Sequence, residues 1–399
     1  MNALPESNAG LMNELAAWLR PDGPPHALLP KTPESWKRLA RRLGNAGLAG
    51  LVLARNRVDA SDAPLVFVDE LRRCAHLAAA HTLNAMSRLE RLVVALNHAQ
   101  VPVILLKGAA LNLTIYDRPD LRPMGDVDLL VRRGDVDKTI EVLLAAGCHR
   151  GAELVRDNFF PKYYYETELV MDSPMPVRID LHVRPLRPMH LAHFIEEGSF
   201  WANAQPVPIG SATALIPSRE RMLVHLAAHA AYHGCARLLW LYDLKRYVEW
   251  AGGAIEWNKV VELSTEWRVS LPVRRAFDRA GALLGPILPA NVRNALSAQR
   301  GGWRDRLALA HAPRDAASPV RHVLVNLACA RGIRHRLGYL AAVLFPARGH
   351  LSDIYPWRHM GWTLCAQAWR FLRPFVRPIV SLAQCIYARR RRTSSHAAS

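Results

Sequence analysis

The stretch from Val101 to Arg132 constrains the fold more than any other part of this 399-residue chain. It begins with a continuous apolar run rich in β-branched residues, Val101 to Leu106, which is typical of a strand buried on both faces. Lys107-Gly108 follows, and the sequence from Ala109 to Tyr116 then favours a helix. A strand, a glycine and a helix N-terminus together present backbone N–H groups and the positive end of a helix dipole, which suits a phosphate.

Two aspartates follow on a second predicted strand, which runs to Val131. Side chains at positions i and i+2 of a strand share a face, so Asp126 and Asp128 project side by side while Val127 and Leu129 point the other way. Two carboxylates held this close repel each other, and a divalent cation is the usual remedy. The pair therefore predicts a metal site at the end of this strand.

A later segment repeats the pattern of one apolar and one polar strand face. The sequence from 162 to 171 alternates and predicts a strand, and the residues around Asp172 supply a turn. The next predicted strand, Val177 to Val183, turns its apolar side chains to one face and Arg178, Asp180 and His182 to the other. A polar face on an otherwise apolar strand is either a solvated surface or a site.

The motifs of these strands resemble those of the uncharacterised nucleotidyltransferases, a branch of the polymerase-β-like nucleotidyltransferase superfamily. The matching segments are KGAAL from Lys107 to Leu111, Tyr116, and RPMGDVDLLV from Arg122 to Val131. The resemblance implies an α+β fold, with a small mixed palm-like sheet flanked by helices and mainly helical N- and C-terminal regions. Similar proteins carry a third carboxylate in the pattern DLHWR, which here reads DLHVR from Asp180 to Arg184, with Val183 in place of tryptophan.

The resemblance also implies an activity, the Mg²⁺-dependent transfer of a nucleoside monophosphate from an NTP to a hydroxyl group. It assigns the catalytic and metal-binding roles to Asp126, Asp128 and Asp180. Nucleotide binding falls to Lys107, Gly108, Ala109 and Arg122. Classical relatives have a phosphate-binding serine where this chain has Ala109, so Lys107 is expected to supply that contact. A lysine at a strand end is otherwise usually solvated, and Arg122 either binds phosphate or pairs with one of the acids.

A row of histidines follows in the predicted helical region. His225, His229 and His233 are spaced at i, i+4 and i+8 and so share one helix face, which Arg237 extends. Three roles are open for the row: packing, contact with the substrate, and zinc binding, for which no fourth ligand stands at metal spacing. The predicted contacts to the acceptor or the nucleotide are His182, Arg184, His229, His233 and Arg237.

The chain divides into four predicted parts. Residues 1–98 form a helical N-terminal region, and residues 99–210 form the nucleotidyltransferase catalytic domain. Residues 211–300 form a helical domain, and residues 301–399 form a basic helical region that ends in a disordered tail.

Positive charge is concentrated at the C-terminus. From Arg300 onward the sequence has seventeen arginines, three aspartates, and no lysine or glutamate, which gives this quarter +14 of the chain's net charge of +18. Such a segment suits an anionic membrane surface or RNA, and an amphipathic helix from Trp362 to Tyr387 fits either partner. A simple solvated basic tail explains the same composition.

The location predicted from the sequence is the cytoplasm, with possible peripheral contact at the inner membrane face. Six cysteines are scattered without a CxxC pair, as expected in a reducing compartment. The N-terminal residues lack the charged and apolar segments of a signal peptide. The apolar stretch from Met360 to Ala388 is interrupted by Arg370, Arg373 and Arg377 and so does not predict a membrane span.

The sequence leaves the acceptor open. An NTP, with ATP as the first candidate, is the expected donor, and the acceptor hydroxyl belongs to a sugar, a lipid-linked glycan, a protein side chain or an RNA end. Proteins of the resembling branch are associated with surface polysaccharide and peptide-modification pathways. Two alternatives are a non-catalytic membrane-associated scaffold that keeps the fold, and an antitoxin-like nucleotidyltransferase acting on RNA or a partner protein.

Overall fold

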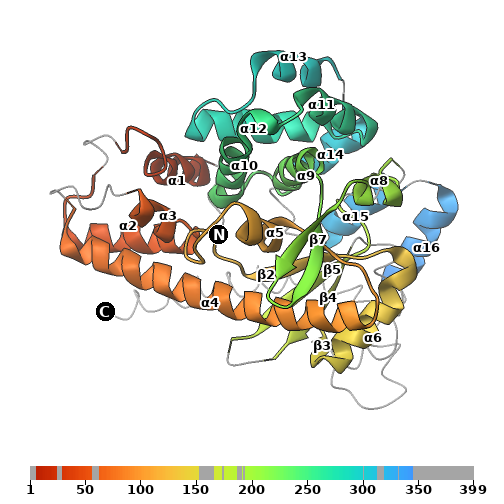
Figure 1. The fold of residues 1–399 in the computed structure, drawn as a ribbon. Coiled ribbons are helices and arrows are strands. Elements are labelled where there is room, and N and C mark those ends of the chain that lie inside the picture. Colours follow the sequence, from red (N-terminus) through yellow and green to blue (C-terminus); the bar gives the residue numbers. More distant parts are fainter. Residues whose placement is uncertain are drawn as a thin grey trace, which may run out of the picture. The chain divides into compact units, whose positions relative to one another are not determined.

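The computed structural model describes residues 6–24, 29–55, 63–151, 166–172, 175–186, 191, 194–299, 301–311, 319–330 and 332–344. Within these residues the chain combines a mixed sheet with many helices (Figure 1), which confirms the predicted α+β class. The residues described up to Ile333 belong to one compact unit, and those from Arg334 onward to a second. The predicted helix from Trp362 to Tyr387 and the disordered tail lie outside the described residues.

Helices dominate the N-terminal region, as predicted. They are α1 (Glu6–Ala17), α2 (Pro33–Asn45), α3 (Ala49–Ala54) and the long α4 (Leu65–His98). A capping box starts α2, in which Thr32 and Ser35 satisfy each other's backbone N–H groups and Pro33 takes the first helical position. Helices α2 and α3 pack on α4, which runs along the sheet and contacts β2, β5 and β7 (Figure 1).

Among the described residues, seven strands form one sheet in the order β3-β4-β5-β2-β1-β7-β6. The strands are β1 (Ile104–Leu105), β2 (Asp126–Leu130), β3 (Cys148–Arg150), β4 (Glu166–Met171), β5 (Val177–His182), β6 (Gln205–Ile209) and β7 (Ala212–Ile216). Strand β2 pairs in parallel with β5 and antiparallel with β1, so both predicted aspartate strands lie side by side at the centre of the sheet.

Strand β1 is shorter than the apolar run, Val101 to Leu106, that predicts it. Regular pairing is confined to Ile104 and Leu105, although the Leu106 N–H donates to the Asp128 carbonyl and the Val103 carbonyl accepts from the Leu215 N–H. Pro102 has no N–H for a ladder and lies exposed, which stops the pairing at the start of the run. The buried run nevertheless ends at the glycine motif, as predicted.

The sequence did not predict the hairpin of β6 and β7. Its turn contains Gly210, which has a positive φ of 54°. Pro206 and Pro208 argue against a strand, but β6 is the outer strand of the sheet, where a missing N–H costs no ladder bond. Strand β7 ends at Ile216, beyond the predicted catalytic boundary at residue 210.

Helices that connect these strands place the glycine motif. Helix α5 (Lys107–Thr114) follows β1 directly and packs on β2. After β2 come the short 3₁₀ helix η2 (Arg133–Asp135) and α6 (Val136–Ala145), and α8 (Glu197–Trp201) precedes the hairpin. The strand-to-helix turn at Lys107 thus lies beside β2, the strand that carries Asp126 and Asp128.

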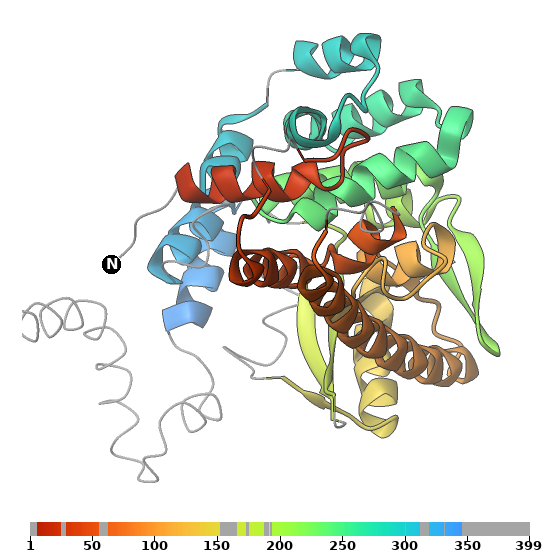
Figure 2. The same cartoon turned by 90° about the vertical axis from the view of Figure 1, so that its left-hand side faces the viewer.

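A group of helices follows the sheet. It comprises α9 (Arg219–Tyr232), α10 (Leu238–Ala251), the 3₁₀ helix η4 (Gly252–Ala254), α11 (Trp257–Glu266), α12 (Ser270–Leu284), α13 (Ala290–Ala298), α14 (Trp303–His311) and α15 (Pro319–Cys329). The N-terminal helix α1 packs on α12 and α10 of this group (Figure 2). The Arg20 side chain beyond α1 donates to the Leu283 carbonyl at the end of α12, 2.7 Å away. The first helix of the chain is therefore part of the later helical layer.

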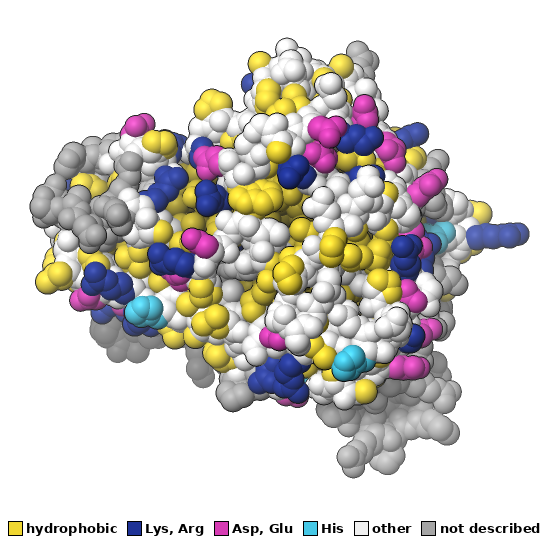
Figure 3. Space-filling model, viewed as in Figure 1, with side chains coloured by type: hydrophobic (Ala, Val, Ile, Leu, Met, Phe, Trp, Pro, Cys, Tyr) yellow, Lys and Arg dark blue, Asp and Glu magenta, His cyan; other side chains and the backbone are white. Residues whose placement is uncertain are grey.

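The last described helix is α16 (Ile333–Leu344). No helix in the described part of the chain is long and apolar enough to cross a membrane. On the face shown in Figure 3, hydrophobic side chains gather in a band across the middle, between the positions of α10 and α4.

Candidate active site

The turn between β1 and α5 holds Lys107 in an unusual backbone conformation. Its φ is +46°, a region that non-glycine residues seldom adopt and that is over-represented at functional sites. The turn brings the Lys107 ammonium to 2.5 Å from Oδ1 of Asp128 on the neighbouring strand β2. The predicted phosphate-binding lysine is thus an ion-pair partner of a predicted catalytic acid.

The strand register gathers the predicted acids on one face of the sheet. In the parallel pair of β2 and β5, Asp128 lies opposite Asp180, and Asp126 lies opposite Arg178. In the antiparallel pair of β4 and β5, Glu168 also lies opposite Asp180. Because partners in a register share a face, three adjacent strands direct carboxylates to the same side.

Arg178 contacts three of these carboxylates. Its Nη2 donates to Oδ2 of Asp126 at 2.7 Å, and its Nε lies 3.4 Å from Asp180 and 3.6 Å from Glu168. The side chain of Arg178 is about half exposed, and each of these three pairs is open to water on at least one side. Surface ion pairs of this kind are weak, so another cation could replace Arg178 as the partner of these carboxylates.

Asp128 is the most deeply enclosed of the acids, with only 3% of its side chain exposed. Besides Lys107, His182 Nε2 lies 2.8 Å from its Oδ1. Burial alone would raise the pKa of the Asp128 carboxyl, but the Lys107 ammonium and His182 outweigh burial and hold the pKa well below its usual range. Asp128 is therefore ionised at any pH at which the protein works.

Asp180 behaves in the opposite way. Burial, followed by repulsion from the Glu166 and Asp128 carboxylates, raises the pKa of Asp180 from 3.8 to about 7. Arg178 offsets only part of this effect. Two aspartates that face each other across β2 and β5 thus have opposite protonation tendencies, the arrangement expected where one carboxyl exchanges a proton near neutral pH.

A cavity of about 350 Å³ opens onto these groups. Of the residues predicted from the sequence, the sheet side of the cavity contains Lys107, Gly108, Arg122, Asp126, Asp128 and Asp180. His182, His229, His233 and Arg237 also line it. The structure thus brings the three acids, the glycine motif and part of the histidine row around one space.

Two predicted residues lie elsewhere. The side chain of Ala109 is fully buried in α5 and does not line the cavity. Arg184, just after β5, is half-buried and also lies outside the cavity lining, and burial and then the nearby Arg133 lower its pKa to about 10. The structure therefore gives neither side chain a contact with the cavity.

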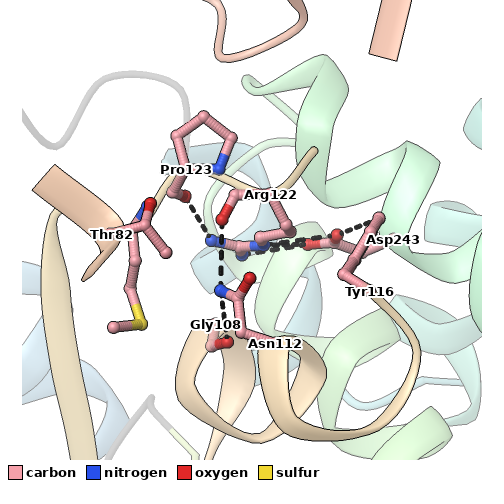
Figure 4. A network of polar contacts seen from close by, with 8 residues as sticks. Thr82, Gly108, Asn112, Tyr116, Arg122, Pro123 and Asp243 are labelled. Carbon is pink, nitrogen blue, oxygen red and sulfur yellow. Dashed lines mark hydrogen bonds and ion pairs between the residues drawn. The ribbon is translucent and has the colours of Figure 1, made fainter. Parts of the chain in front are cut away.

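Arg122 is buried and pairs with Asp243 of α10, not with any of the three acids (Figure 4). Its Nη2 donates to Asp243 Oδ2 at 3.0 Å, and its Nη1 donates to the Pro123 carbonyl at 2.9 Å. The Tyr116 hydroxyl donates to Asp243 Oδ1 at 2.8 Å. The network connects the motif before β2, the end of α5 and the later helical layer, and it holds the guanidinium at the cavity wall.

Gly108 leaves room for that guanidinium. A Cβ at position 108 would lie 2.9 Å from Arg122 Nη1 and 3.2 Å from Met124 Cγ. Asn112, one turn later in α5, donates to the carbonyls of both Gly108 and Arg122. The glycine of the motif therefore has a packing role that is distinct from its predicted role in nucleotide binding.

The histidine row divides along its length. His225 is fully buried, and its ring packs against Phe200 and His229. His229 and His233 lie farther along, with ring centroids 4.4 Å apart, and both pack edge-on against Trp240 at the cavity wall. The first histidine is a core residue, and the next two belong to the cavity.

Replacement of His225 should flatten the pH dependence of stability. Burial lowers the pKa of the His225 imidazole from 6.5 to about 3. The unfolded chain then binds a proton that the folded chain does not, so stability falls as the pH drops from 6.5 toward 3, by roughly 4–5 kcal/mol at most. Urea denaturation at pH 7 and pH 5 should show a smaller loss for His225→Phe than for the wild type, and exposed His76→Phe serves as control. An equal loss in all three proteins contradicts the assignment.

A comparison with protein families decides the class of the chain. The family model described as "Uncharacterised nucleotidyltransferase" matches residues 32–285, more than half of the sequence. The chain belongs to the uncharacterised nucleotidyltransferase family. No curated protein matches the sequence.

The matched range of this nucleotidyltransferase runs from the N-cap of α2 to the end of α12. It contains every residue that lines the cavity and the buried pair of Arg122 and Asp243. The activity class that goes with the family, nucleotidyl transfer, therefore belongs to the part of the chain that holds the site.

Several residues that line the cavity were not among the predicted site residues, and three of them carry charged or aromatic side chains. Glu166 and Arg178 line the cavity from β4 and β5, and Trp240 lines it from α10. A signal for the first two existed, because Arg178 stands two positions before Asp180 and Glu166 lies on an alternating strand. Trp240 follows Arg237 by three positions, close to one helical turn, and carries that guanidinium over its ring at 5.0 Å.

Proposed function

We propose that this nucleotidyltransferase moves a nucleoside monophosphate from an NTP to a hydroxyl group in the 350 Å³ cavity. The proposal rests mainly on the convergence of Asp126, Asp128 and Asp180 at one cavity beside the β1–α5 turn. In this reaction the acceptor oxygen bonds to the α-phosphorus. The bond from that phosphorus to the oxygen bridging to the β-phosphorus breaks, and pyrophosphate leaves.

The donor set suits Mg²⁺ by its chemistry. Within the described residues no three Asp, Glu, His or Cys side chains are already grouped as a metal site. However, the raised pKa of Asp180 reflects burial and then repulsion among carboxylates, and a divalent cation relieves such repulsion. Asp126, Asp128 and Asp180 would hold the ion. When bound, it would supply positive charge to the triphosphate and the leaving pyrophosphate.

The protein's own groups account for the remaining steps. Lys107 and Arg122 supply fixed positive charge beside the glycine motif, where the phosphates would lie. Asp180 would accept the proton of the acceptor hydroxyl, because it lines the cavity opposite Asp128 and a carboxylate is a common general base. His182 holds Asp128, which has to stay ionised.

Calorimetric titration with each of the four NTPs tests this function. With Mg²⁺ present, the wild type should bind at least one NTP about tenfold more tightly than in EDTA, since the ion would bridge protein and phosphates. Asp126→Asn should remove this Mg²⁺ dependence. Asp137→Asn, at an exposed position of α6, should not. If no NTP binds, or if EDTA does not change the affinity, the result contradicts this proposal and favours the non-catalytic scaffold.

A further inference from the structure

A second cavity adjoins the charged one. Its volume is about 620 Å³, and it lies among α1, the end of α2, α4 and the segment that leads into α10. Its lining is mainly apolar and includes Leu11, Met12, Leu15, Ala78, Met124 and Leu238. The band of hydrophobic side chains in Figure 3 crosses the same part of the molecule, between α10 and α4. The cavity thus differs in chemistry from its charged neighbour.

The two cavities share part of their walls. Pro123, Gly125, Arg237 and Leu239 line both of them. Gly125 directly precedes Asp126, and a Cβ placed on it would meet no atom within 4 Å. The second cavity therefore adjoins the proposed catalytic carboxylates at Gly125, where no side chain fills the space.

Arg237 places a positive charge where the two cavities meet. Within the described residues it forms no ion pair, and its exposed guanidinium lies over the Trp240 ring. An arginine stacked on an aromatic ring keeps its outer N–H groups available for an oxygen-rich partner. A molecule that spans the two cavities would thus meet a polar contact where its apolar part ends.

The apolar lining of the second cavity favours some classes of acceptor over others. Each buried CH₂ contributes about 0.8 kcal/mol to binding. Arg42, Asn45 and His81 also line the cavity, but its mainly apolar wall offers few partners for the many hydroxyl groups of a sugar. A triphosphate belongs beside the cations of the first cavity for the same reason. The second cavity therefore suits the body of the acceptor and not the donor.

We propose that the second cavity binds the acceptor, and that the acceptor is an amphipathic alcohol. Its aliphatic body occupies the space between α1 and α4, and its hydroxyl reaches Asp180 past Gly125 and Arg237. This inference rests on the proposed nucleotidyl transfer and narrows its acceptor class.

A series of model acceptors tests the inference. The protein is incubated with Mg²⁺, the NTP that it binds, labelled at the α-phosphorus, and either glycerol or straight-chain 1-alkanols from butanol to octanol. The value of kcat/KM for transfer to the alcohol should rise about three- to fourfold per added methylene, the equivalent of the 0.8 kcal/mol above. Equal values for glycerol, butanol and octanol would overturn the inference.

Two tryptophan variants on α4 localise the effect. Ala78→Trp fills the second cavity and should lower kcat/KM for octanol at least tenfold while glycerol and the Kd of the NTP change little. Ala80→Trp, at an exposed position of α4, should match the wild type. An equal response to octanol in both variants contradicts the assignment. Absence of transfer to any alcohol or to water defeats the proposed function itself, whereas transfer without a chain-length effect defeats only this inference.

Discussion

Asp180→Asn is expected to abolish transfer and to stabilise the protein at the same time. The carboxamide keeps the shape of the side chain but cannot accept the proton of the acceptor, and loss of a positioned base typically lowers kcat by 10²–10⁴-fold. Affinity for the NTP should change far less. Rates of pyrophosphate release, with calorimetry for binding, measure the two effects separately.

The gain in stability follows from the sign of the pKa shift. The pKa of Asp180 is raised to about 7 by burial and by neighbouring carboxylates, so the folded state disfavours the ionised form. The cost begins as the pH rises above the unfolded value of 3.8 and is complete above 7. At pH 8 in EDTA, the asparagine variant should be more stable than the wild type by roughly 2–4 kcal/mol in urea denaturation. A variant that is inactive because it is unstable would show that Asp180 is structural.

Asp243→Leu should be among the most destabilising single substitutions in the described part of the chain. It leaves the guanidinium of Arg122 buried without its carboxylate and removes the acceptor of the Tyr116 hydroxyl. Breaking a buried pair from one side typically costs 3–5 kcal/mol. The free energy of unfolding, from urea denaturation, gives the loss directly.

The double variant Arg122→Met with Asp243→Leu separates pairing from packing. If the loss comes from an uncompensated charge, removal of both partners should recover most of it, since buried pairs are often replaceable by apolar side chains. The double variant should still bind NTP more weakly than the wild type, because it lacks Arg122, which lines the charged cavity. A double variant less stable than Asp243→Leu alone would contradict this explanation of the network.

The local parts of the site could be predicted from the sequence. The strand-to-helix turn at Lys107-Gly108 and the shared face of Asp126 and Asp128 follow from apolar runs and from the two-residue period of a strand. Asp180 was predicted from a resemblance, and the parallel register of β2 and β5 places it opposite Asp128. That cross-strand register depends on the whole sheet, so no local pattern specifies it.

The long-range parts could not be predicted. Arg122 has its partner on α10, far along the chain, and a sequence offers no rule for choosing Asp243 over the nearby acids. The role of Gly108 in making room for a guanidinium depends on the same contact. The β6–β7 hairpin was missed because prolines argue against strands, and only the order of strands reveals that β6 is at the edge.

Parallel incubations with α-labelled and γ-labelled NTP test the central claim most directly. The protein, Mg²⁺ and a cell extract are combined, and the label is traced to acceptor, pyrophosphate or phosphate. Nucleotidyl transfer at the Asp126, Asp128 and Asp180 site predicts that the α label becomes attached to an acceptor and the γ label leaves in pyrophosphate, with both products lost in Asp180→Asn. Transfer of the γ label to the acceptor, or identical products from the wild type and Asp180→Asn, would contradict the account.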